Sequence, residues 1–360
     1  LVAKGGPGSS DSRFDSAFDA SGFHWRSGPG DWRVELRGSA DRSDVAVDLG
    51  PDLTLRRQPY AFSAALEAER KAGDAHAIDL GAQWKQTNTL LQGDFARLPV
   101  ELGSGVDFSS LSHTAVDALG RKGVSSLWAQ DRWQLLPTAS MSLGVRFDQV
   151  DISSECHFSP RWSSELGPFD HTVLRAAIGD YFQSPSDLET VPGWSPIAAR
   201  SSLVRNYTVG LQQGLGRAEL RLEAYHKDFE HRFPEVSVPT GLTGSGNVTL
   251  NAASTGWAEG AEALLRVHAW GPFSGWISYA WSSVLRSSGQ GGYYDADFSQ
   301  PHVGNLVLQA ALPRHWTVGG RWRLASGIPY TPVLSRSYDL ATGRWTPVFG
   351  ATNSQRLPVY

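Results

Sequence analysis

The chain has 360 residues, a formal net charge of −4 at pH 7 and 41% hydrophobic residues. These residues form no run of about 18 that could be a transmembrane helix, and the charge balance provides no basic surface for nucleic acid, so a nucleic-acid partner is excluded. The single cysteine, Cys156, excludes an intramolecular disulfide framework and a structural zinc site built on thiolates.

Segments in which apolar and polar residues alternate recur along the chain. In chain order, the clearest run over residues 60–69, 78–85, 139–148, 220–227 and 316–324. In the third, Ala139, Met141, Leu143, Val145 and Phe147 alternate with Ser140, Ser142, Gly144, Arg146 and Asp148. A period of two predicts strands with one apolar and one polar face. Their length is close to the ~10 residues that a tilted strand needs to cross a bilayer, whereas soluble strands average about 5 or 6.

The connections between these segments fall into two classes. Short links are predicted at 27–31, 71–74, 135–138, 167–171, 214–217, 271–274 and 313–315. Long polar links rich in Gly, Ser and Pro are predicted at 86–123, 185–202, 230–255, 287–301 and from 326 onward. We expect short and long links to alternate without a break, as in an antiparallel sheet with tight turns on one edge and loops on the other.

Five tryptophans lie beside the short links, namely Trp32, Trp133, Trp270, Trp276 and Trp316. Amphipathic rings at one end of successive strands are typical of an aromatic girdle at a membrane–water interface. The alternative, ordinary core tryptophan in a soluble all-β protein, does not account for their shared position. Since only a closed barrel satisfies strand backbones in lipid, the sequence predicts an all-β, antiparallel transmembrane β-barrel or part of one, with its apolar faces on outer-membrane lipid and its polar faces on a hydrated lumen.

Ser126–Leu135 (SLWAQDRWQL), followed by Ala139–Asp148, resembles a hairpin of the TonB-dependent outer-membrane receptors. Similar segments follow in the same order, namely 159–161 (SPR) with Thr172–Pro185, Tyr207–Asp228, Asp297–Asn305 (DFSQPHVGN) and Ala325–Pro332 (ASGIPYTP). Their order and spacing carry the resemblance, which covers roughly residues 20–360.

The resemblance implies a plug domain followed by a barrel of about 22 strands. We count about 14 strands here, so residues 1–360 are expected to be the C-terminal part of the barrel domain, without the plug, the segment that binds the TonB-type energy-coupling complex, or the last strand. The start at Leu1, without an initiator methionine or signal peptide, fits either processing or a piece of a longer protein, and the resemblance favours the piece.

Catalytic and metal sites are not expected. Residues 226–231 (HKDFEH) match neither HExxH nor HxxEH, the two metalloprotease spacings. Residues 241–246 (GLTGSG) lack the strand and helix of a nucleotide-binding loop, and we interpret residues 155–157 (ECH) as solvated surface. Serines near His226 or His302 could imitate a barrel hydrolase, but serines are so common that chance pairing explains them better. The chain is therefore expected to be neither an enzyme nor a cofactor-binding protein.

Polar residues on the lumen faces and aromatic residues in the loops are the candidate ligand-binding set. Arg175, Tyr181 and Gln183 share one strand face, Glu262, Arg266 and His268 share another, and Arg321 and Arg323 a third. The loop candidates are Trp194, Tyr293 and Tyr294, because amphipathic rings bind solutes at low entropic cost. Ion pairing inside the barrel and solvent-tolerant loop filler are the competing interpretations of these two groups.

The resemblance implies the function of an outer-membrane receptor that binds a scarce small molecule or iron chelate and takes it up into a bacterial cell. Siderophores, cobalamin and glycans are the ligand types that it implies, with the plug domain of the same full-length chain and the TonB-type complex as partners. The alternative is a passive porin or a surface-interaction barrel without energy coupling.

Overall fold

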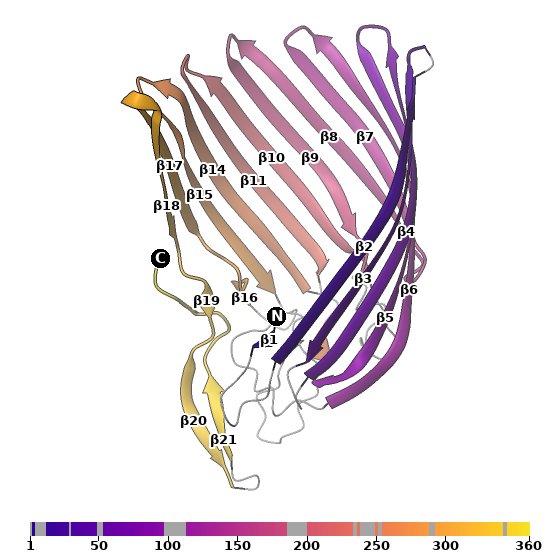
Figure 1. The fold of residues 1–360 in the computed structure, drawn as a ribbon, viewed down its shortest axis with the longest axis vertical. Coiled ribbons are helices and arrows are strands. Elements are labelled where there is room, and N and C mark those ends of the chain that lie inside the picture. Colours follow the sequence, from indigo (N-terminus) through magenta and orange to yellow (C-terminus); the bar gives the residue numbers. More distant parts are fainter. Residues whose placement is uncertain are drawn as a thin grey trace.

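The structure is a computed structural model, which describes residues 2–3, 12–28, 30–48, 53–96, 113–185, 200–232, 236–237, 249–250, 254–287, 292–340 and 344–360. These residues form one sheet of sixteen strands, in which the main strands pair in chain order and antiparallel (Figure 1). Fourteen strands of this sheet have ten or more residues, as predicted. Within the described part, no helix is long and apolar enough to cross a bilayer.

The strands of the N-terminal half are β1 (Val2–Ala3), β2 (Ser12–Ser27), β3 (Trp32–Asp48), β4 (Leu53–Ala72), β5 (His76–Ala96), β6 (His113–Leu136), β7 (Ala139–Val150), β8 (Glu155–Phe169) and β9 (Thr172–Gln183). Those that follow in the sheet are β10 (Ser202–Gly214), β11 (Ala218–Arg232), β14 (Ser254–Trp270), β15 (Phe273–Ser287), β16 (Tyr293–Asp295), β17 (His302–Leu312) and β18 (Trp316–Ala325). Three small two-stranded sheets are formed by β12 (Val236–Ser237) with β13 (Thr249–Leu250), β19 (Pro329–Tyr330) with β22 (Gln355–Arg356), and β20 (Val333–Asp339) with β21 (Arg344–Phe349).

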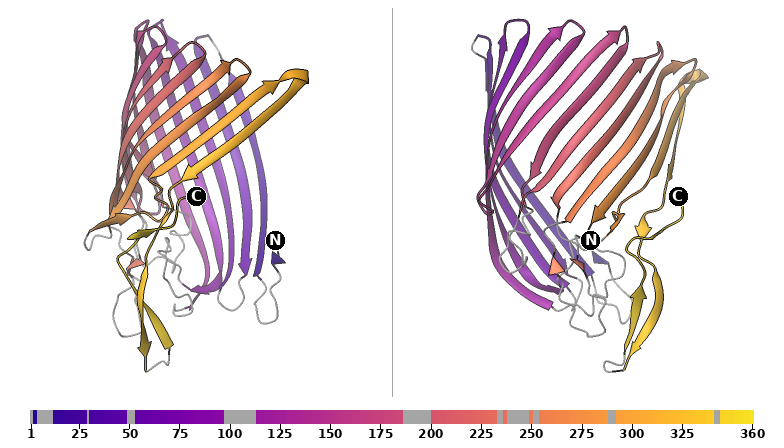
Figure 2. Two further views of the ribbon diagram at one scale, coloured as in Figure 1. Left: turned by 90° about the vertical axis from the view of Figure 1, so that its left-hand side faces the viewer. Right: turned by 180° about the vertical axis from the view of Figure 1, so that it is seen from behind.

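The main sheet curves into a trough whose two sides end at β2 and β18 (Figures 1 and 2). In the described part of the chain, no strand pairing joins β18 to β1 or β2. The short turns gather at one end of the trough, at the top of Figure 1, and the strand ends that the longer links join lie at the other end. In the outer-membrane arrangement, the short-turn end is periplasmic and the other end is extracellular.

The register places the apolar and polar residues of each strand on opposite faces. Leu143 of β7 lies opposite Trp162 of β8, and the next pair is Gly144 with Arg161. We call the face of Leu143 the outer face and that of Arg161 the inner face. The predicted outer residues of β7 (Ala139, Met141, Leu143, Val145, Phe147) share one face, and the same alternation holds for 220–227 on β11 and 316–324 on β18.

The aromatic girdle differs from its prediction at one residue. Trp32, Trp133 and Trp316 lie on the outer face near the short turns, where Arg70 lies over Trp32 at 5.4 Å and His76 stacks on Trp133 at 5.4 Å. Trp276, in contrast, pairs with Arg266 and Val307 and therefore faces inward. The prediction for Trp276 was wrong because it considered only how near the residue is to a turn and not which face of the strand it lies on.

Six of the seven predicted short links are confirmed as tight turns, and the seventh, 27–31, contains residue 29, which lies outside the described residues. Gly73, Gly216 and Gly271 take positive φ in three of these turns, which glycine does without strain. The strict alternation of short and long links is wrong. The β7–β8 connection, Asp151–Ser154, is a tight turn at the extracellular end, and only four residues separate β3 from β4. The predicted 86–123 link is largely strand, because β5 continues to Ala96 and β6 begins at His113.

The strands β3 to β6 extend past the bilayer, and their polarity reverses there. On the outer face, the apolar band of β3 ends at Ala40 and is followed by Arg42 and Asp44. Arg56 and Gln58 donate hydrogen bonds to the carboxylate of Asp44 (2.7 Å each), which lowers the pKa of Asp44 to about 2. On the inner face at the same height lie Val45, Val47, Leu55 and the fully buried Leu91. The outer surface of this extension is therefore suited to water.

The two faces can be compared at one height, since Ala176 and Ala177 are adjacent half-buried residues of β9. Ala176 lies beside Val209 on the outer face, and Ala177 lies beside Thr208 on the inner face. We expect Ala176→Lys to lower the free energy of unfolding by about 2–4 kcal/mol, because it places a charge in lipid, and Ala177→Lys to have a much smaller effect. Urea-dependent refolding of the full-length receptor into vesicles measures both, and equal effects would contradict the assignment of the faces.

Candidate functional site: the inner face of the sheet

Ion pairs cover the periplasmic part of the inner face on β2 to β4. Arg33 pairs with Glu69, and Arg37 with Glu67, across neighbouring strands. Between these two pairs the Glu35 carboxylate accepts contacts from Arg26 at 2.8 Å and His24 at 3.2 Å. This part of the wall is built of mutually satisfied charges, which supports the structural interpretation of lumen charges there.

A second cluster is centred on Arg146 of β7. Its guanidinium donates to the Asp148 carboxylate (2.9 Å) and to the Ser126 hydroxyl (2.7 Å), and it lies over the Trp128 ring at 5.3 Å. The Trp128 indole N–H in turn donates to Asp79 (2.8 Å). Because Asp148 is only 13% exposed, this cluster fixes the wall of the lumen and leaves little charge for a solute.

The candidates on β9 lie on the inner face, as predicted, but at different heights. Arg175, near the periplasmic turns, donates to Glu165 (3.0 Å) and to Gln212 (2.9 Å). Tyr181 lies near the extracellular end, where the Arg161 guanidinium lies over its ring at 4.5 Å. Gln183 follows on the same face and is exposed. The three side chains therefore line a path along the strand.

Glu262 and Arg266 of β14 also face inward and are exposed. Arg266 lies opposite Glu219, which pairs with Arg221 on the same strand, and Glu262 lies opposite Glu223. Two carboxylates side by side at Glu223 and Glu262 have no cation between them in the described ion pairs. Arg321 and Arg323 face inward on β18, as predicted, beside Val307 and Asn305.

The predicted loop candidates do not form one cluster. Trp194 lies outside the described residues. Tyr293 pairs with Ser287 on the outer face, where its ring lies 4.4 Å from that of Trp257, whereas Tyr294 pairs with Arg286 on the inner face. Tyr293 is therefore directed away from the lumen, because successive residues of β16 point to opposite faces.

The extracellular end of β8 holds a polar group that sequence analysis interpreted as solvated surface. Burial raises the pKa of Glu155, but hydrogen bonds from the Ser201 N–H (2.9 Å) and the Ser153 hydroxyl (2.9 Å) outweigh it, so that the pKa is lowered overall. His157 stacks on Phe182 at 4.0 Å. Cys156 faces outward between these two inner residues, so the three side chains do not converge, and the described residues contain no metal-holding cluster of His, Cys, Asp and Glu.

The end of β16 and the residues after it bind the C-terminal segment through contacts that sequence analysis missed. Asp295 accepts from Arg356 (2.8 Å) through its carboxylate and from the Asn353 amide (2.8 Å) through its backbone carbonyl, and Asp297 accepts from the same amide. Ala325 and Tyr360 exchange backbone hydrogen bonds of 2.8 and 3.1 Å. No local sequence pattern predicts these contacts, because the residues that form them lie more than 30 positions apart in the chain.

The comparisons with known proteins agree with this geometry. A family model described as "TonB dependent receptor-like, beta-barrel" matches residues 4–355. The chain belongs to this family. It is therefore an outer-membrane protein, and the resemblance predicted from its hairpin motifs is confirmed. The search of curated proteins found no match.

Solved structures of this receptor family share the fold at low sequence identity. The ferric yersiniabactin uptake receptor FyuA from Yersinia pestis is 13% identical, with a TM-score of 0.71 over 99% of this chain and 54% of that one. The pyoverdine receptor FpvA from Pseudomonas aeruginosa PAO1 is 12% identical, with a TM-score of 0.66 over 94% and 54%. The copper transporter OprC is 13% identical, with a TM-score of 0.66 over 88% and 55%. The chain thus spans about half the length of these proteins.

The receptor chain offers a comparison between a buried and an exposed inner ion pair. Asp148→Ala should lower the free energy of unfolding by about 1–3 kcal/mol, because it leaves the Arg146 guanidinium without its carboxylate. Glu165→Ala should cost about 0–1 kcal/mol, because both partners of the Glu165–Arg175 pair are about half exposed. Urea-dependent unfolding followed by tryptophan fluorescence measures the difference, and the reverse order of effects would be inconsistent with the structural role of Asp148.

Proposed function

We propose that this chain is the ligand-conducting barrel part of a receptor that takes up a scarce solute across the outer membrane. The observation that carries the proposal is the division of the membrane-spanning part of the sheet into a mainly apolar outer face and a charged, hydrogen-bonding inner face. A hydrophilic solute can move along such an inner face while the outer face stays in lipid.

Five inner residues and one near the rim are proposed to contact the solute or the plug domain. They are Arg175, Tyr181, Gln183, Glu262, Arg266 and Tyr294. Their side chains offer guanidinium and amide donors, carboxylate acceptors and aromatic faces, which suit a polar chelate of several oxygen atoms. Trp194 remains a proposed contact on sequence grounds, whereas Tyr293 is not favoured because it faces outward.

The proposed partners follow from the family. Since the chain spans about half of its solved relatives, we propose that a plug domain of the same full-length chain fills the trough and that a TonB-type complex remodels this plug. The named relatives take up ferric yersiniabactin or are titled for pyoverdine and copper, which supports a siderophore or another metal-containing solute here. Cobalamin and glycans are the further candidates. The reaction involves binding and movement, with no covalent step.

The test compares uptake with binding in cells that carry the full-length gene. Under iron limitation, with a panel of radiolabelled ferric siderophores, we expect one of them to bind and to accumulate only when the energy-coupling complex is present. Binding without accumulation is expected in cells that lack this complex. Equal accumulation in both strains would contradict the proposal and favour a passive porin.

A matched pair of variants tests the inner wall itself. Arg266→Ala, on the inner face, should slow accumulation of the identified solute several-fold, because it removes a cation that is exposed to the lumen. Leu265→Ala, its neighbour on the outer face, should leave accumulation unchanged at equal receptor abundance. If both variants behave like the parent protein, Arg266 lies off the solute path.

A further inference from the structure

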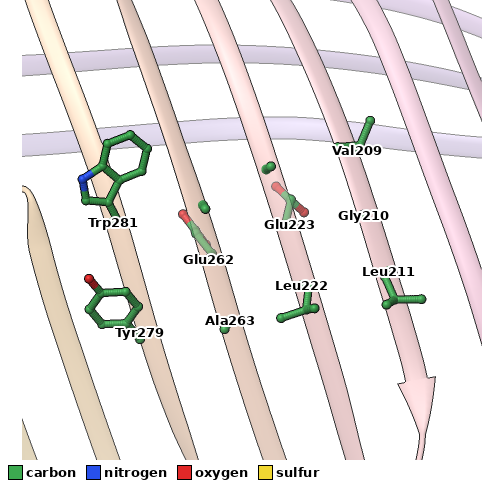
Figure 3. A pocket seen from close by; sticks show the side chains of 11 residues that line it. Val209, Gly210, Leu211, Leu222, Glu223, Glu262, Ala263, Tyr279 and Trp281 are labelled. Carbon is green, nitrogen blue, oxygen red and sulfur yellow. The ribbon is translucent and has the colours of Figure 1, made fainter.

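The outer face of β10, β11, β14 and β15 contains an apolar groove of about 490 Å³ (Figure 3). Behind it, Figure 3 shows the N-terminal strands of the opposite wall, so the groove is seen from the convex side of the trough. The outer-face residues that line it are Val209, Leu211, Leu222, Ala224, Ala261, Ala263, Tyr279 and Trp281, and Gly210, Glu223 and Glu262 of the inner face complete the lining. All four strands have paired neighbours on both sides, so the groove lies away from the open edges of the sheet.

The cross-strand register explains why the surface is hollow here. At one height the outer residues run Val209, Ala224, Ala261 and Trp281 across the four strands. The two alanines lie side by side, so the floor is two strands or about 10 Å wide. At the next height, Ala263 lies between Leu222 and Tyr279. Large side chains therefore form the two walls, and methyl groups form the floor.

The two ends of the groove differ in chemistry. Toward the periplasmic turns, the next outer residues are Leu220, Leu265 and Ile277, which continue the apolar band. Toward the extracellular side, the next residues are His226 and Glu259, with His226 Nδ1 3.8 Å from the Glu259 carboxylate and His226 Nε2 3.0 Å from that of Asp228. The ring of Tyr207 lies 6.2 Å from that of His226. The groove is thus apolar along its length and polar at its extracellular rim.

From this geometry we propose that the groove binds one acyl chain of an outer-leaflet membrane lipid, with the lipid headgroup at the rim formed by Tyr207, His226, Asp228 and Glu259. The argument for lipid is continuity, because the groove lies within the apolar outer face that contacts the bilayer. A flexible hydrocarbon chain fits a concave, methyl-floored surface, and the change from apolar to polar at the rim matches the change from chain to headgroup. The flat rings of Tyr279 and Trp281 form the wall against which the chain lies.

The groove is a specific lipid site only if an acyl chain prefers it to the rest of the outer face. Because the surrounding lipid tails are as apolar as the groove, such a preference comes from closer van der Waals packing of the chain and not from removal of water. A tenfold preference corresponds to about 1.4 kcal/mol. Ala82, on the other side of the trough, is a control position for Ala261. It lies between Leu66 and Leu127 on the outer face, so its small side chain has large neighbours on both sides.

The test uses the full-length receptor in phosphatidylethanolamine–phosphatidylglycerol vesicles that contain a phosphatidylethanolamine with a diazirine in the middle of one acyl chain. After illumination, mass spectrometry locates the lipid adducts. We expect about tenfold more adduct per residue on Leu222, Tyr279 and Trp281 than on Leu66 and Leu127. Ala261→Phe, which fills the floor, should remove this excess, whereas Ala82→Phe should leave it unchanged.

Heat-modifiable mobility on gels verifies that both variants fold, and Ala261→Val provides a milder filling if the phenylalanine variant does not. An even distribution of adducts around the outer face would overturn the proposal, because the lipid would then be ordinary surrounding lipid. Lack of adducts in the groove, with cross-links from its residues to a second protein, would overturn it too, because the occupant would be a protein.

Discussion

Backbone hydrogen bonding in lipid is the constraint on which the rest of the structure depends. Within the bilayer every N–H and C=O must bond inside the protein, and a sheet does this by pairing each strand with its neighbours. Once the strands are paired, side chains must alternate between lipid and lumen. Neighbouring strands then place their outer faces side by side and their inner faces side by side over the membrane-spanning part, as Leu143 opposite Trp162 and Gly144 opposite Arg161 illustrate.

The same constraint explains what happens where it ends. Beyond the bilayer, water accepts backbone and side-chain hydrogen bonds on the outer face, so Asp44 and Arg56 stand where Leu36 and Leu66 stand in the membrane. The inner face at that height becomes apolar, as at Leu91. The membrane-spanning part of these strands therefore has lipid on its outside and charged side chains on its inside. Their extension beyond the bilayer has charged side chains on its outside. The groove on β10 to β15 is a local variation on the lipid-facing part, produced by small side chains alone.

Much of this could be predicted from the sequence, because alternation is a local property that two or three residues reveal. The faces of β7, β11 and β18 and six tight turns were predicted from such local patterns. Trp276 was wrongly predicted because proximity to a turn says nothing of the face. The opposite directions of Tyr293 and Tyr294 depend on a strand too short to show a pattern. The Asn353 contacts join distant segments, so only the folded chain brings them together.

The measurement that tests this account most directly is a single-cysteine scan of residues 219–225 on β11 in the full-length receptor, with Cys156 replaced by serine. Spin labels at each position report contact with oxygen, which concentrates in lipid, or with a water-soluble nickel chelate. The account predicts high oxygen contact at Leu220, Leu222 and Ala224 and high chelate contact at Glu219, Arg221, Glu223 and Tyr225. A profile without a period of two, or equal chelate contact at all positions, would contradict the division into a lipid face and a lumen face.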